Sequence, residues 1–200
     1  MTTREARIRR RHAGLVGALT GRGRSRLELA VEAGAFAVLL ALLAGYVGAT
    51  GGWGTGALGT VVLAVVAVDL VGGTVTTLST AAKRERHGRA FRLGFVACHT
   101  VHFAVVGAVF ATGWAWPVVN AAWLVMAALL IEWTRLQVRR VVAVTASVSG
   151  VLAGLLWLPV PPYLAWIPGL LFLKLLVGFL VPEAPPGSEE GVGSMGTSAH

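Results

Sequence analysis

Apolar residues dominate six stretches of this chain, and each stretch is long enough to cross a lipid bilayer as a helix. About 20 apolar residues in helical form span the hydrocarbon core. The six stretches are residues 27–50, 57–80, 91–112, 117–134, 138–158 and 163–181. The connections between them are short, which favours antiparallel neighbours. The pattern predicts an all-α fold, a polytopic integral membrane protein in which residues 27–181 form a six-helix transmembrane bundle.

The distribution of charge predicts the orientation of this bundle. Every Lys and Arg except Lys174 falls within residues 4–26, 83–92 or 135–140. Cytoplasmic loops carry an excess of Lys and Arg, and the basic segments alternate with connections that carry no charge. Both termini are therefore expected in the cytoplasm, with the protein in the plasma membrane. The aromatic residues Trp53, Trp114, Trp116, Trp157, Tyr163 and Trp166 would then lie at the outer interface, which such rings prefer.

The two ends of the chain differ from the bundle in composition. Residues 1–26 contain eight arginines and predict a retained basic cytoplasmic tail, while residues 182–200 are rich in Pro, Gly and Ser and predict a disordered cytoplasmic tail. Only 13% of all residues are charged, against about 25% in a soluble domain. Because the basic clusters separate apolar runs, the expected partner is a bilayer with anionic inner-leaflet headgroups, and no nucleic acid.

A polar stripe follows one face of the second predicted helix. Its members recur at helical spacing and are Asp69, Gly72, Gly73, Thr76, Thr77 and Thr80. The other face is made of Val, Leu and Ala, so the stripe is expected to point into the bundle. Its two glycines would allow another helix to approach closely.

His99 and His102 share a face of the third predicted helix, with His102 at the depth of Asp69 and His99 about one turn closer to the cytoplasm. Asp69 and His102 each lie eleven residues, about 16 Å, from the cytoplasmic end of their helix. We therefore expect Asp69 and the histidines to meet. Three interpretations follow: a structural polar cluster, a proton relay, or a site for a divalent metal such as zinc. In the metal site Asp69, His99 and His102 would supply three ligands and leave one position open.

An intramembrane aspartate with hydroxyls and paired histidines resembles the polar groups of intramembrane zinc amidohydrolases, such as the alkaline ceramidases and the progestin–adipoQ receptor family. The resemblance covers two helices, and those proteins have seven spans and a different ligand spacing. It implies a metal-dependent, membrane-embedded hydrolase acting on a lipid, with Thr76 or Thr77 in contact with substrate. The alternatives are a component of a small-solute or proton transporter and a non-catalytic scaffold or accessory subunit.

Three further features bear on packing. Lys174 either extends to the inner headgroups or acts as a counter-ion for Asp69 or Glu132, and Glu132 is expected to pair with Arg135 at the surface. The fifth predicted helix carries a seam of small residues, made of Ala143, Ser147, Gly150 and Gly154. Such a seam serves either packing within the bundle or formation of a homo-oligomer.

Overall fold

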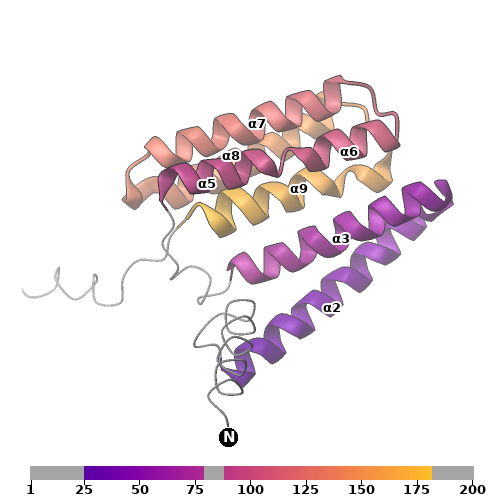
Figure 1. Ribbon diagram of the computed structural model, residues 1–200, viewed down its shortest axis with the longest axis horizontal. Helices are drawn as coiled ribbons and strands as arrows, with labels where there is room; N and C mark the ends of the chain where they lie inside the picture. Colours follow the sequence, from indigo (N-terminus) through magenta and orange to yellow (C-terminus); the bar gives the residue numbers. More distant parts are fainter. Residues whose placement is uncertain (1–24, 79–87, 182–200) are drawn as a thin grey trace, which may run out of the picture.

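The computed structural model describes residues 25–78 and 88–181, and these ranges are helical with short turns (Figure 1). The long helices are α2 (Arg26–Ala49), α3 (Gly56–Leu78), α5 (Arg89–Cys98), α6 (Val101–Val109), α7 (Ala115–Trp133), α8 (Leu136–Trp157) and α9 (Trp166–Phe172). The π-helical segment η3 (Leu173–Phe179) continues α9, and the 3₁₀ turns η1 (Gly52–Gly54) and η2 (Pro162–Leu164) lie between helices. The predicted tails lie outside the described residues apart from Ser25 and Arg26, as does Thr80.

Within residues 25–78 and 88–181, six helical segments are long and apolar enough to cross a membrane. They are α2, α3, α5 with α6 (Arg89–Val109), α7, α8, and α9 with its flanking segments (Pro162–Phe179). The prediction of an all-α protein with six long apolar helices is therefore confirmed. The third predicted helix differs in detail, because α5 and α6 are separated by a tight turn at His99 and Thr100.

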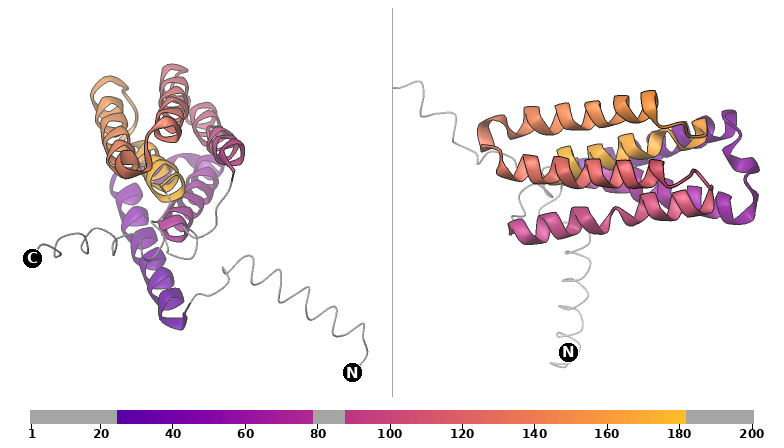
Figure 2. Two further views of the ribbon diagram at one scale, coloured as in Figure 1. Left: turned by 90° about the vertical axis from the view of Figure 1, so that its left-hand side faces the viewer. Right: turned by 90° about the horizontal axis from the view of Figure 1, so that it is seen from above.

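The last helix, α9 with η3, forms the centre of the bundle. It packs against α3 on one side and against α8 and α7 on the other. Leu171, Leu175 and Leu176 are completely buried there. Figure 2 shows this helix enclosed when the bundle is seen end-on. The central helix therefore packs against α3, α7 and α8, and these contacts restrict its position.

Helix α2 is the least enclosed element. Its main contacts are with α3, and Val47 is the one residue of α2 that is buried in the described structure. Its first turn is well formed, since Ser25 and Glu28 make a capping box with reciprocal bonds of 3.1 and 3.2 Å. The end of α2 at Arg26 diverges from the bundle, whereas its other end remains against α3 (Figure 1).

The two ends of the bundle differ in charge. The start of α5, the end of α7 and the start of α8 lie at one end, called here the arginine end; it carries Arg89, Arg92, Arg135, Arg139 and Arg140. At the opposite end, the connections 50–55, 110–114 and 158–165 contain no charged residue. Gly51, Gly56 and Gly113 adopt positive φ there, which glycine allows without steric cost.

Candidate functional site

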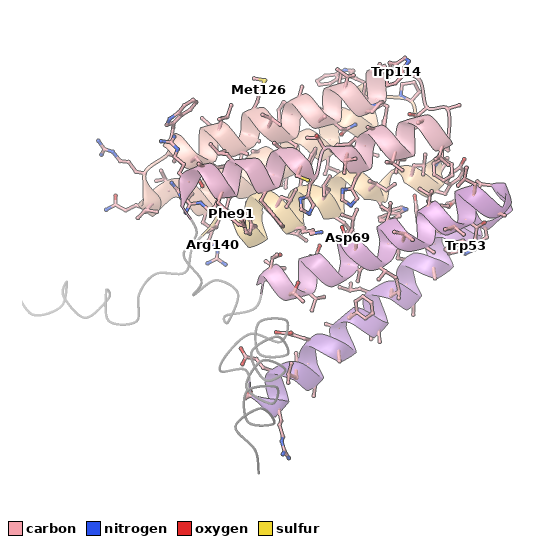
Figure 3. All side chains as sticks on the ribbon, viewed as in Figure 1. Trp53, Asp69, Phe91, Trp114, Met126 and Arg140 are labelled. Carbon is pink, nitrogen blue, oxygen red and sulfur yellow. The ribbon has the colours of Figure 1, made fainter. Side chains whose placement is uncertain are left out.

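An ion pair joins α3 to the central helix. Nζ of Lys174 lies 2.7 Å from Oδ2 of Asp69 and 3.4 Å from the Asp69 carbonyl oxygen. The Lys174 side chain is 4% exposed, whereas that of Asp69 is 43% exposed. Asp69 lies nine residues before Leu78, the end of α3, which is about 14 Å along the helix axis. The carboxylate thus stands far from the helix end, at the edge of the bundle interior (Figure 3).

Gly73 makes room for the Lys174 side chain. A Cβ atom at Gly73 would overlap Cε of Lys174, so the lysine reaches Asp69 only because this position has no side chain. One turn further along α3, the Thr77 hydroxyl donates to the Gly73 carbonyl at 2.8 Å and lies 3.2 Å from the Lys174 carbonyl oxygen, and a Cβ at Gly178 would overlap that hydroxyl. Two glycines on opposite helices therefore let α3 and η3 approach closely.

The predicted polar stripe is divided between two neighbouring helices. Gly73 and Thr77 face the central helix, whereas a Cβ at Gly72 would lie 3.4 Å from Phe36 of α2, and the exposed Thr76 donates to the Gly72 carbonyl. Thr74 was not part of the prediction. It is buried and donates to the Leu70 carbonyl at 2.7 Å, with the Leu170 carbonyl at 3.5 Å. Its spacing of four residues from Leu70, on the same face of the helix, was the signal available in the sequence.

The turn between α5 and α6 orients both histidines. His99 Nδ1 lies 2.8 Å from the Phe95 carbonyl oxygen, and His102 Nδ1 lies 3.0 Å from the His99 carbonyl oxygen. The two rings stack with their centroids 5.4 Å apart. On its other side, His102 Nε2 lies 3.1 Å from Oδ2 of Asp69. His102 therefore contacts Asp69, while the His99 ring is held by its own helix.

Both ring nitrogens of His102 face acceptor oxygens. A neutral imidazole has one donor nitrogen and one acceptor nitrogen. A hydrogen on Nδ1 would bond the His99 carbonyl, whereas a hydrogen on Nε2 would bond the Asp69 carboxylate, so the tautomer decides which bond a neutral ring makes. An imidazolium would make both bonds. The cluster thus places His102 and Lys174 against one carboxylate oxygen of Asp69.

The arrangement expected for a divalent metal such as zinc is not formed. Across residues 25–78 and 88–181, no group of three His, Cys, Asp or Glu side chains is placed to hold a metal ion. The physical reason lies in the contacts of Asp69. The Lys174 ammonium lies against the same Asp69 oxygen that His102 contacts, and a positive charge at that oxygen opposes the binding of a cation. Asp69, His99 and His102 share a region of the bundle without forming a ligand set.

A second charged cluster lies at the arginine end. The Glu132 side chain is 1% exposed and accepts two bonds from Arg92, at 2.8 and 2.7 Å. Arg139 places Nη1 3.8 Å from the same carboxylate and donates to the Glu132 carbonyl at 3.2 Å. The expected surface pair of Glu132 with Arg135 was wrong, because Glu132 points into the bundle and pairs across α5 and α8. It is no counter-ion for Lys174, which pairs with Asp69.

The small-residue seam of α8 faces the interior of the same chain. Ala143, Ser147 and Gly150 are buried, and a Cβ at Gly150 would overlap the indole of Trp123. That indole donates from Nε1 to the Ala146 carbonyl at 3.0 Å. Gly154 has more room, because a Cβ there would lie 3.9 Å from the nearest atom, in the Asn120 side chain. The seam therefore serves helix packing between α8 and α7.

No family model matches the chain, and no curated protein or solved structure is significantly similar to it. The function is therefore inferred from the geometry of the charged clusters.

Proposed function

We propose that the six apolar helices insert in the plasma membrane with the arginine end, and hence both termini, in the cytoplasm. Support comes from the asymmetry of the two ends, one with five arginines and the other with uncharged connections. In a Cys98→Ser background, Thr112→Cys should react with an impermeant thiol reagent added outside cells, and Gln137→Cys should react only after the membrane is opened. The reverse pattern of labelling would overturn this orientation.

We propose further that the protein conducts protons, alone or together with a small solute, through the Asp69–His102–Lys174 cluster. The observation that carries this proposal is the pair of acceptor oxygens facing the two nitrogens of His102. Protonation of His102 would let both of its ring nitrogens donate to these oxygens. Intramembrane Asp and His side chains serve such proton relays in pumps and transporters.

The exposure of Asp69 favours a transport role over a purely structural one. Moving a carboxylate from water into an apolar medium is unfavourable. The attraction between the Asp69 carboxylate and the Lys174 ammonium would nevertheless be strongest if both were fully enclosed. Asp69 instead keeps 43% of its side chain exposed, so the described helices do not enclose the carboxylate completely. Protonation of Asp69 would leave the buried Lys174 ammonium without its counter-charge, and this couples proton binding on α3 to the central helix.

Proton flux into liposomes tests the proposal directly. The purified full-length protein is reconstituted with a pH-sensitive dye inside the vesicles, and flux is measured under a pH gradient and under a potassium diffusion potential. Wild-type protein should acidify the lumen faster than empty vesicles. Asp69→Asn should abolish the difference, His102→Gln should reduce it at least tenfold, and Cys98→Ser should leave it unchanged.

Two results would reject proton conduction. One is the absence of flux from folded wild-type protein under both driving forces. The other is equal flux from wild type and Asp69→Asn. In either case the cluster is a structural contact, and Asp69→Asn would then change only the thermal stability, as expected for a non-catalytic scaffold or accessory subunit.

A further inference from the structure

Five arginines and a single carboxylate lie at the arginine end of the described bundle. Along residues 88–157 the charged residues are Arg89, Arg92, Glu132, Arg135, Arg139 and Arg140. Five guanidinium groups against one carboxylate leave a formal charge of +4. The contacts of Glu132 with Arg92 and Arg139, and of Arg89 with the neighbouring Trp133, join three helices into one basic cluster.

The basic cluster has more hydrogen-bond donors than acceptors. Glu132 gives both of its oxygens to Arg92, and only a 3.8 Å contact remains for Arg139. Arg139 is 7% exposed, and its Nε is buried without a hydrogen-bond partner in the part of the chain that the structure describes. A buried donor without an acceptor costs about 1–3 kcal/mol. The cluster therefore has unused capacity for an anion.

The first turn of α8 adds donors of the same kind. Its N-cap is Arg135, with no side-chain cap and no acidic residue in the first turn. The first backbone N–H groups of a helix have no partner within the helix and carry partial positive charge. Arg139 lies in this turn, so the unpartnered Nε and the uncapped helix end occur in one place.

Apolar side chains surround the cluster on the outside of the bundle. Trp133, Leu136 and Phe91 are exposed, and the Arg89 guanidinium lies 5.3 Å from the centre of a Trp133 ring. Figure 3 shows Phe91 and Arg140 at this end of the bundle. A ligand that fits both surfaces carries phosphate oxygens for the arginines and hydrocarbon for the exposed rings. Both properties belong to an anionic phospholipid.

We propose that the arginine end of α5, α7 and α8 is a binding site for the headgroup of an anionic phospholipid. Arg89 and Arg135 contact its phosphate from the exposed side, the buried Arg139 adds positive charge beneath them, and acyl chains pack on Trp133 and Leu136. The proposal rests on the membrane insertion proposed above, with this end at the inner leaflet, where anionic lipids are enriched.

Lipid binding can be measured on the purified full-length protein in neutral detergent. Phosphatidylglycerol and phosphatidylcholine of equal chain length are titrated while the unfolding midpoint is followed, and bound lipid is counted by native mass spectrometry. Phosphatidylglycerol should raise the midpoint and remain bound, and phosphatidylcholine should do neither. The double variant Arg89→Gln/Arg135→Gln should weaken phosphatidylglycerol binding at least tenfold.

Arg26→Gln is the matched control, because it removes an exposed arginine from α2, away from the cluster. The rest of the basic tail is identical in all of these proteins, so its own attraction to lipid cancels in the comparison. Equal effects of both lipids, or undiminished binding by the double variant, would overturn the site. An equal shift with inorganic phosphate alone would identify a free-anion site and overturn the lipid assignment.

The lipid measurement and the flux measurement fail independently. Asp69→Asn should bind phosphatidylglycerol as wild type does, because Asp69 lies outside the basic cluster. Failure of proton flux therefore leaves the lipid site standing, and loss of lipid binding in Arg89→Gln/Arg135→Gln without loss of flux leaves the proton proposal standing.

Discussion

The side chain of Lys174 passes over Gly73 to reach Asp69, and Nζ and Oδ2 lie 2.7 Å apart although 105 residues separate them in the chain. A charged group on the most enclosed helix is thus neutralised by a carboxylate on the neighbouring helix. The contact depends on a glycine whose only role there is to leave space. This contact bears on both the stability and the proposed function of the protein, and different substitutions can test each of them separately.

Removal of the lysine charge should destabilise the protein through Asp69. Lys174→Met leaves the carboxylate with His102 alone, and we expect a loss of about 2 kcal/mol in the free energy of unfolding. That value lies between the ~0.6 kcal/mol average of interhelical hydrogen bonds in membranes and the ~3–5 kcal/mol for breaking a fully buried pair. Reversible unfolding in detergent measures it. The double variant Asp69→Asn/Lys174→Met should recover at least half of the loss; no recovery would show that the two charges are not coupled.

Gly73→Ala should displace Lys174 from Asp69 and thereby reduce proton flux. The added methyl group overlaps the far end of a flexible side chain, so the lysine can move at modest cost in stability. Gly72→Ala is the matched control, because its methyl group would only contact Phe36 at 3.4 Å. Flux in liposomes should fall for Gly73→Ala and persist for Gly72→Ala. The same flux from both variants would mean that the position of Lys174 does not matter for conduction.

Two glycines of α8 should respond differently to alanine. At Gly150 a methyl group overlaps the Trp123 indole and comes within 2.7 Å of Phe172, while at Gly154 the nearest atom is 3.9 Å away. Overpacking of this kind costs roughly 1–3 kcal/mol. Thermal unfolding should therefore show a lowered midpoint for Gly150→Ala and a nearly unchanged one for Gly154→Ala. If Gly154→Ala were the more damaging substitution and lowered the oligomeric mass, the seam would serve an oligomer instead.

Glu132→Gln should be among the most destabilising single changes at the arginine end. It removes the one carboxylate that Arg92 and Arg139 share, and the buried Arg139 then lacks a counter-charge. We expect a loss of about 3 kcal/mol or more, as for the removal of one partner from a buried pair. Arg135→Gln changes an exposed side chain and should alter stability by less than about 0.5 kcal/mol. Comparable effects of the two substitutions would contradict the burial of Glu132.

The charged clusters show which contacts the sequence predicts correctly and which it does not. Asp69 and His102 were predicted to be near each other because each lies eleven residues from the cytoplasmic end of its predicted helix. The depth of both follows from the rise per residue of an α-helix. The same reasoning wrongly gave Glu132 a partner three residues along the chain. Its actual partners come from two other helices, and the rotation of a helix about its axis is set by packing that no local pattern specifies.

Local sequence therefore determined that six long apolar helical segments form, because a run of about 20 apolar residues has few alternatives to a helix. It also determined the division of charge between the two ends. Tertiary structure alone decided that α9 and η3 occupy the centre, that the α5–α6 turn aims His102 at Asp69, and that Lys174 contacts the Asp69 oxygen that faces His102. Those outcomes depend on which glycines let two helices approach closely. A glycine can be identified as such a contact point only when the position of the side chain opposite it is known.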